Sequence, residues 1–124
     1  MSVIQAPPAA THDLGGTRFT SLATPTRGSS ETAVWQVEIE PGTLPTPHSM
    51  TREEVFVVLA GRATVRIGKD TAVADVGDAI VVPTDTEFEL SNVDSAVLRL
   101  LCCSPVGAMA QVGDDQPFTP PWAK

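Results

Sequence analysis

The sequence has few basic residues, and those it has do not cluster. Its 124 residues include 8 Lys and Arg against 15 Asp and Glu, which gives a net charge of −7. Nucleic acids and anionic membrane surfaces are bound through clustered Lys and Arg. We therefore expect neither nucleic acid nor a membrane as a partner, and we interpret the acidity as a source of solubility.

Long hydrophobic runs are also absent. The longest, residues 55–60, is far shorter than the stretch of about 18 apolar residues that crosses a bilayer as a helix. Residues 1–5 do not show the basic region followed by an apolar segment that marks a secretory signal. The sequence thus predicts a soluble, cytoplasmic protein.

Cysteine is scarce, and its placement excludes a disulfide scaffold. The two cysteines, Cys102 and Cys103, are adjacent, so on a strand they point to opposite faces and a disulfide between them would be strained. They do not form a CxxC metal pair either. The pair is best interpreted as two small hydrophobic residues of a strand.

Helical periodicity is missing, whereas turn-forming residues are plentiful, with 11 Pro and 9 Gly. Between the turns, strand-like segments recur about every ten residues, which predicts one all-β domain with a sandwich or barrel architecture. These segments are 18–22, 33–40, 54–59, 62–67, 71–76, 79–82, 87–90 and 96–103. Alternation along them, with Arg99 facing water, predicts that the inward-facing side chains include Trp35, Val37, Ile39, Leu98, Leu100 and Cys102.

The two ends of the chain lack this pattern. Residues 1–16 are rich in Ala, Pro, Thr and Gly, and we expect a flexible N-terminal arm there. Residues 17–105 form the predicted barrel. Residues 106–124 are rich in Gly, Asp and Pro, and we expect this tail to pack on the barrel through Phe118 and Trp122.

Two central stretches carry chemically distinctive residues at fixed spacings. The first contains Gly42, His48, Met50, Glu54 and Gly61, and the second contains Gly77, Pro83, Asp85, Phe88 and Asn92. At these spacings the stretches resemble the paired motifs of the cupin family. Three positions depart from that family, because Met50 and Phe88 stand where it has histidine and Asp85 stands where it has glycine.

The resemblance implies a double-stranded β-helix, which is a jelly-roll barrel open at one end, with a small molecule bound in the mouth. It also implies a homodimer, and the open edges of a small sandwich favour pairing as well. Cupins usually hold a divalent metal with three His and one Glu, and the matching positions here are His48, Met50, Glu54 and Phe88. Asn92 matches a motif position for which we expect a turn role.

The substitutions remove most of the metal-ligating chemistry. Only His48 and Glu54 keep good ligands for a borderline or hard divalent ion, and catalytic zinc sites normally keep three. We therefore expect no tightly bound native metal. The alternative is a divalent ion held by His48 and Glu54 with an unrecognised further ligand.

The same substitutions predict an apolar pocket floor. With Met50 and Phe88 in the former ligand positions, and with Phe56 and Cys102 as further candidate ligand contacts, the pocket suits a hydrophobic or aromatic small molecule. The alternative is that these side chains simply fill the barrel core.

Three functions remain open. The first is a metal-independent isomerase, cyclase or lyase in which His48 and Glu54 act as general acid and base. The second is a non-catalytic binding or sensing protein in which this pair is only a buried polar contact. The third is a metal-dependent oxygenase or isomerase. Glu53, next to Glu54 on the alternating strand, is expected to face solvent.

Overall fold

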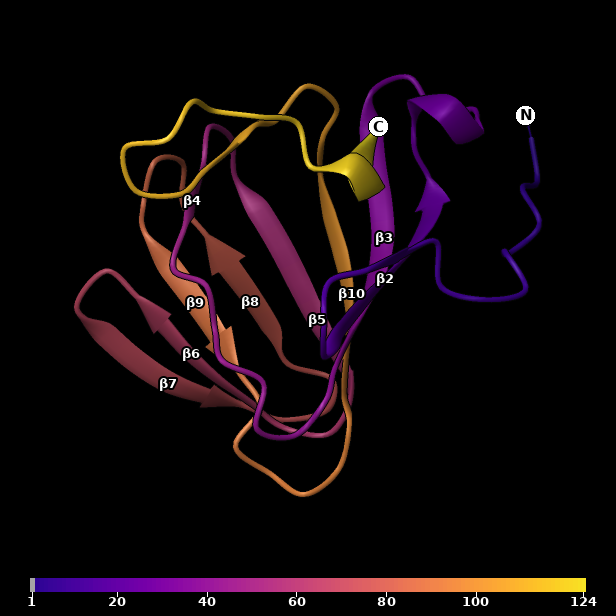
Figure 1. Ribbon diagram of the computed structural model, residues 1–124. Coiled ribbons are helices and arrows are strands. Elements are labelled where there is room, and N and C mark those ends of the chain that lie inside the picture. The colour runs from indigo at the N-terminus through magenta and orange to yellow at the C-terminus, as the bar shows by residue number, and fades with distance from the viewer. Residues whose placement is uncertain (1) are drawn as a thin grey trace.

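The computed structural model describes residues 2–124, which form short antiparallel strands and two 3₁₀ turns (Figure 1). The elements are β1 His12–Asp13, β2 Thr17–Ala23, η1 Pro25–Arg27, β3 Thr32–Ile39, β4 Ser49–Met50, β5 Glu54–Ala60, β6 Ala63–Ile67, β7 Asp70–Ala74, β8 Ala79–Val82, β9 Phe88–Ser91, β10 Leu98–Pro105, β11 Ala110–Gln111 and η2 Pro121–Ala123. No α-helix occurs within these described residues, and none of their helical segments is long and apolar enough to cross a membrane. The predicted all-β class is confirmed.

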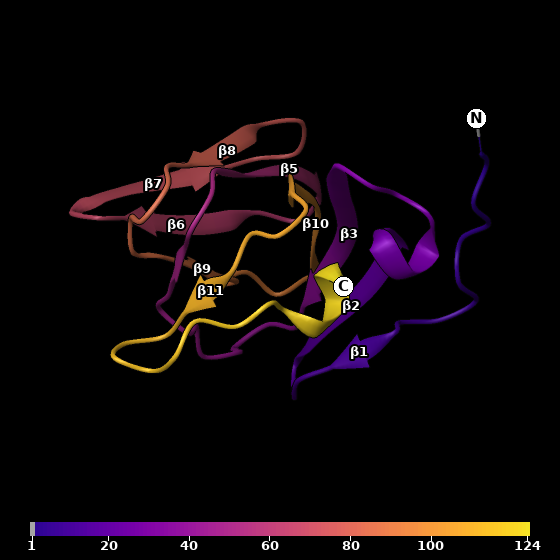
Figure 2. The ribbon, with the colours of Figure 1, turned by 90° about the horizontal axis from the view of Figure 1, so that it is seen from above.

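The strands form two facing layers of a jelly-roll barrel (Figures 1 and 2). One layer is a six-stranded sheet in the order β1-β2-β3-β10-β5-β8. The other contains the three-stranded sheet β7-β6-β9 and the two-stranded sheet β11-β4. An isolated antiparallel bridge between His48 and Phe88 connects these last two sheets. The second layer is therefore continuous at the point where His48 lies.

Alternation along the strands builds the core between the layers. On β3 the side chains of Trp35, Val37 and Ile39 are buried, as the sequence pattern predicted. On β10 the buried residues include Leu98 and Leu100, while Arg99 between them is exposed. Each fully buried large apolar side chain contributes about 1.5–3 kcal/mol to folding. The facing apolar sides of the two layers therefore define the interior in which the site lies.

Both ends of the chain contact the barrel. Within the expected N-terminal arm, β1 pairs with β2 and brings His12 opposite Phe19. The C-terminal tail crosses one end of the barrel, where β11 pairs with β4 (Figure 1). The Trp122 ring stacks on Phe19 with ring centroids 3.6 Å apart, and the Ser21 hydroxyl donates to the Trp122 carbonyl at 2.7 Å. The tail thus closes part of the barrel mouth.

Asn92 ties the turn before β10 to the end of β3. Its side-chain amide donates to the carbonyl oxygens of Ile39 and Ala96, both at 2.8 Å, and its side-chain oxygen accepts from the Asp94 amide at 3.1 Å. Asn92 is buried, so these bonds satisfy it within the protein. The expected turn role of this motif residue is confirmed.

Asp85 adopts a backbone conformation that glycine adopts more readily. Its φ of 57° lies in the left-handed region, and its amide donates to the Met50 carbonyl at 2.8 Å. Asp tolerates this region better than most residues with a Cβ, but the conformation still costs more for Asp than for glycine. This position, where the resembling motif has glycine, therefore carries backbone strain.

We predict that Asp85→Gly stabilises the protein by about 0.5–1 kcal/mol, because it removes the strain of a Cβ at positive φ. Urea denaturation of the two chains measures the difference. Asp85→Ala is the matched control, since it removes the same charge but keeps the Cβ, and it is expected to destabilise. Equal effects of the two substitutions would point to the charge instead of the backbone.

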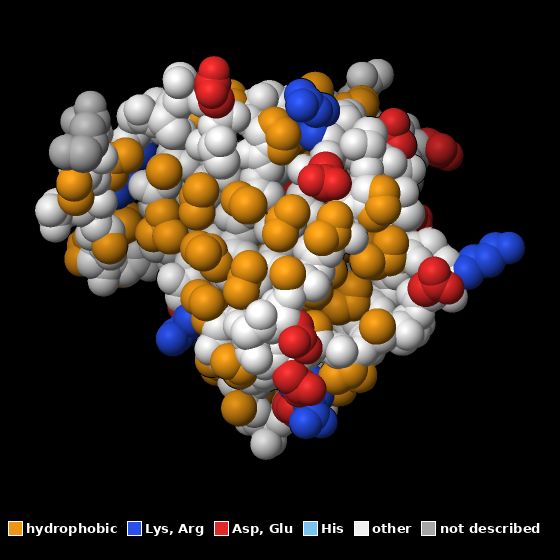
Figure 3. All heavy atoms as spheres, turned by 180° about the vertical axis from the view of Figure 1, so that it is seen from behind, with side chains coloured by type: hydrophobic (Ala, Val, Ile, Leu, Met, Phe, Trp, Pro, Cys, Tyr) orange, Lys and Arg blue, Asp and Glu red, His pale blue; other side chains and the backbone are white. Residues whose placement is uncertain are grey.

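The outer face of the six-stranded sheet is unusually apolar. Viewed from behind, hydrophobic side chains spread across the molecule (Figure 3). Cross-strand neighbours on this face are Val34 of β3, Leu101 and Cys103 of β10, Val55 and Val57 of β5, and Val81 of β8. These side chains are half-buried or exposed. The expected homodimer stays a prediction.

Candidate functional site

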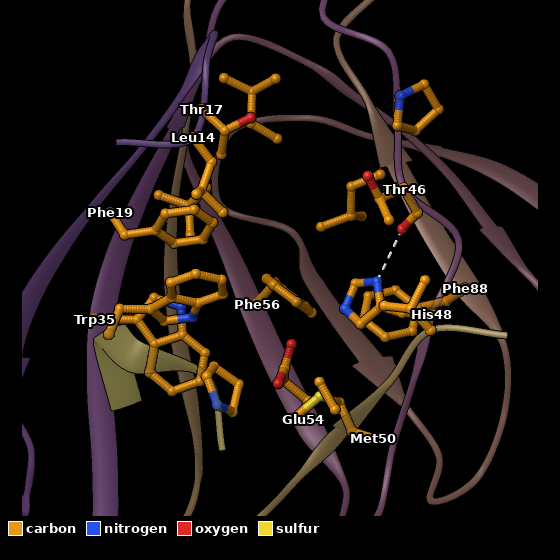
Figure 4. Close-up of a pocket in the computed structure, with 18 of the residues that line it drawn as sticks. Leu14, Thr17, Phe19, Trp35, Thr46, His48, Met50, Glu54, Phe56 and Phe88 are labelled. Carbon is orange, nitrogen blue, oxygen red and sulfur yellow. Dashed lines mark hydrogen bonds between the residues drawn. The ribbon is translucent and has the colours of Figure 1, made fainter. Parts of the chain in front are cut away.

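A cavity of about 220 Å³ opens between the two layers, beneath the C-terminal tail. The structure brings His48, Met50, Glu54 and Phe88 to its lining, together with Phe56 (Figure 4). The other lining residues are mostly apolar and come from β2, β3, the 43–46 loop and the tail. Five of the six candidate site residues therefore share one cavity.

The strand pairing explains why these side chains converge. His48 and Phe88 exchange backbone hydrogen bonds of 3.1 and 2.8 Å across their bridge, and their rings lie 4.4 Å apart at the centroids. Glu54 and Phe56 are two residues apart on β5, so both point to the same face of the sheet. His48, Glu54 and Phe88, which match the metal-ligand positions of the family, therefore reach the same cavity from the two layers.

Glu54 is a buried carboxyl group without a partner. Its residue is only 3% exposed, and it makes no side-chain hydrogen bond or ion pair with any residue between 2 and 124. Figure 4 shows the carboxyl pointing into the cavity between Trp35 and His48. Burial raises the pKa of Glu54 to about 8, because an apolar surrounding disfavours the charged form. At neutral pH the group is therefore mainly a neutral carboxylic acid.

His48 is held in one tautomer by the loop that precedes it. Its Nδ1 lies 2.9 Å from the Thr46 carbonyl oxygen, and because a carbonyl only accepts, Nδ1 must carry the hydrogen. In the neutral ring Nε2 is then an acceptor, and Figure 4 shows this nitrogen on the cavity side. His48 and Glu54 share the cavity, but no hydrogen bond joins them among the described contacts.

Aromatic and thioether side chains form the remaining walls. Phe88 is fully buried, Met50 and Trp35 are each 2% exposed, and the Phe56 and Phe88 rings lie 5.8 Å apart. Phe19 and Trp122 extend the aromatic wall toward the mouth. Sequence analysis did not assign Trp35, Phe19 or Trp122 to the site. Alternation did predict that Trp35 points inward, but no local pattern relates Phe19 to Trp122.

Cys102 lies behind the cavity wall. It is fully buried, stands opposite both Trp35 and Phe56 in the sheet, and is not among the residues that line the cavity. Burial, with a smaller contribution from the nearby Glu54 carboxyl, raises the pKa of the Cys102 thiol well above its ordinary value. The thiol is therefore an unreactive packing group at neutral pH, and its position gives a direct ligand contact little support.

The donor set does not fit the family's three-histidine metal site. Residues 2–124 contain no group of three or more His, Cys, Asp or Glu side chains arranged to hold a metal ion. Phe88 cannot ligate, Met50 offers a soft thioether, and a neutral carboxylic acid must lose its proton before it binds a metal. The expected absence of a tightly bound native metal stays a prediction.

Comparison with known proteins establishes the family. Residues 35–104, more than half of the chain, match the model of the cupin domain. The chain belongs to the cupin family. An uncharacterized protein of Methanocaldococcus jannaschii, MJ1618, is 32% identical over 54 residues, which span 44% of this chain and 43% of that protein.

Solved structures share the fold at low identity. The plu4264 protein from Photorhabdus luminescens superposes with a TM-score of 0.70 and 21% identity, over 83% of this chain and 87% of that one. Oxalate decarboxylase from Bacillus subtilis, a protein with Mn(II) centres, superposes with a TM-score of 0.65 and 21% identity. That match covers 73% of this chain and 26% of the enzyme. The cupin fold is therefore shared with a protein that has Mn(II) centres.

Proposed function

We propose that this cupin binds a small, mainly apolar organic molecule in the cavity, and that Glu54 and His48 provide its polar contacts. The observation that carries the proposal is the buried Glu54 carboxyl, which lacks a partner inside an aromatic cavity. Ionisable groups with strongly shifted pKa values concentrate at functional sites. A ligand that bonds to Glu54 gives this carboxyl a partner inside the cavity.

The cavity volume limits the size of the molecule. At about 220 Å³ it is smaller than the pockets of roughly 300–1,000 Å³ that hold drug-sized ligands. Because the walls are rings, methyl groups and a thioether, most of the ligand surface must be apolar. One ring with a short polar substituent meets both requirements.

The same two groups suit metal-independent proton transfer. In their neutral forms His48 Nε2 accepts a proton while Glu54 donates one, which is the pairing of general base and general acid. A bound molecule between them is in a position to lose a proton at one atom and gain one at another. This chemistry belongs to an isomerase, a cyclase or a lyase.

Titration with benzyl alcohol tests the binding proposal, with the fluorescence of Trp35 and Trp122 as the readout because both residues line the cavity. We predict a saturable change in the natural chain. Ala110→Leu, which adds carbon atoms inside the cavity, is expected to weaken binding about tenfold or more. Ala79→Leu adds the same atoms on the exposed face of β8 and is the matched control. A natural chain without saturable binding, or equal losses in the two variants, contradicts the proposal.

A further inference from the structure

The polar atoms that face the cavity are arranged for a hydrogen-bond donor. Once ionised, the Glu54 carboxyl only accepts, and His48 Nε2 accepts because Nδ1 already donates to Thr46. Figure 4 shows both groups directed toward the same space in front of Phe56. Two hydrogen-bond acceptors therefore face the cavity once Glu54 is ionised.

Positive side chains are missing from this cavity. Among the described residues, none that line it is Lys or Arg. Arg18, on β2 between the lining residues Thr17 and Phe19, lies on the other face of the strand and donates to Glu40 at 2.8 Å. An anionic ligand would find no Lys or Arg here, and it would meet a carboxyl inside a protein of net charge −7. The chemistry of the lining thus disfavours carboxylates and phosphates.

The walls favour a cation instead. The rings of Phe19, Trp35, Phe56, Phe88 and Trp122 line the same cavity as Glu54. The face of an aromatic ring attracts an ammonium group within about 6 Å of its centroid, and this attraction strengthens where water is excluded. A site for an organic cation needs aromatic rings and a group that can carry the opposite charge. The cavity contains both, because its lining includes these rings and the Glu54 carboxyl.

We propose that the cavity selects a small organic amine, with an aromatic or other apolar body packed on the rings and a protonated nitrogen that donates to the Glu54 carboxylate and to His48 Nε2. This inference rests on the proposed function and specifies its ligand class. A bound ammonium offsets the effect of burial on Glu54, because an opposite charge in contact favours the ionised carboxyl. An alcohol supplies only one hydrogen and no charge, so it satisfies the site incompletely.

The test compares three probes with the same ring and different charge: benzylamine, benzyl alcohol and benzoate. Their dissociation constants for the natural chain are measured by tryptophan fluorescence and by calorimetry at one fixed pH. We expect benzylamine to bind about tenfold or more tightly than benzyl alcohol, since a charge-assisted hydrogen bond and cation–π contact are added. Benzoate is expected to bind more weakly than either.

Two variants assign the selectivity to the cavity carboxyl. Glu54→Gln is expected to remove the advantage of benzylamine over benzyl alcohol, because the amide preserves the shape of the site without its charge. Glu53→Gln removes the same charge at the exposed neighbouring position and should leave all three constants unchanged. An equal loss in both variants would assign the selectivity to overall charge and overturn the proposal.

The outcomes separate this inference from the proposed function. Benzyl alcohol or benzoate binding as tightly as benzylamine overturns the amine assignment but leaves a small-molecule cavity. If none of the three probes gives saturable binding, the proposed function fails together with the amine assignment.

Discussion

Glu54→Gln is expected to stabilise the protein progressively as the pH rises from about 5 to about 8. The buried carboxyl has no partner, and burial raises its pKa to about 8 from its ordinary value of 4.5. In the unfolded chain the same group is ionised above about pH 4.3. Between these two values the folded protein therefore holds a proton that the unfolded chain has released.

The sign of the effect follows from proton linkage. Stability falls with rising pH wherever the folded state binds more protons, with a slope of about 1.4 kcal/mol per pH unit for one group. Over the interval from 4.5 to about 8 this amounts to roughly 5 kcal/mol at most. The penalty is absent below the unfolded pKa and complete above the folded pKa. Gln stays neutral at every pH, so the Glu54→Gln variant does not have this pH-dependent loss of stability.

Chemical denaturation at about pH 5 and about pH 8 measures this difference. The variant should exceed the natural chain by about 1 kcal/mol at most at the lower pH and by several kcal/mol at the higher pH. Glu53→Gln, at the adjacent exposed position, should show no such dependence. A gain from Glu54→Gln that is the same at both pH values would mean that Glu54 titrates normally in the folded protein.

Much of the framework could be predicted from the sequence, because it depends on local patterns. Alternation on β3 and β10 identified inward residues such as Trp35 and Leu100, since a strand turns each side chain to the opposite face. The resemblance to the cupin motifs implied that His48 and Phe88 would lie at one site, and the backbone bridge between them is the physical reason that they meet. The turn role of Asn92 followed from its place after a strand.

The parts that could not be predicted depend on distant contacts. Stacking of Trp122 on Phe19 joins residues that no local pattern relates, and it is set by how the tail crosses the barrel mouth. Likewise, the sequence suggested a contact between His48 and Glu54, but it could not show that the Thr46 carbonyl engages the His48 ring. That bond depends on the path of the proline-rich loop. The acid and the base consequently lie in one cavity without a direct bond.

Phe88→His is expected to turn this cavity into a divalent metal site. Phe88 is fully buried, its ring lies 4.4 Å from that of His48, and both residues line the cavity with Glu54. An imidazole at position 88 gives two His and one Glu, which is the protein ligand count of catalytic zinc sites. A metal ion would also favour the ionised form of Glu54, because an opposite charge lowers the pKa of a carboxyl. We expect Zn²⁺ to bind the variant at least about 100-fold more tightly than it binds the natural chain.

Competition against a chelator of known affinity measures this gain, and Phe88→Leu is the matched control because it alters the same buried position without adding a ligand. Without metal, Phe88→His should lose about 1–3 kcal/mol of stability, since it buries a polar ring in place of an apolar one. Added Zn²⁺ should recover much of that loss in Phe88→His and none in Phe88→Leu, because only a ligand that binds the folded state stabilises it. If Phe88→His gains no affinity, the side chain at 88 does not approach His48 and Glu54 closely enough to complete a site. The residues at 48, 54 and 88 would then not be arranged as the resemblance to the family's metal ligands implies.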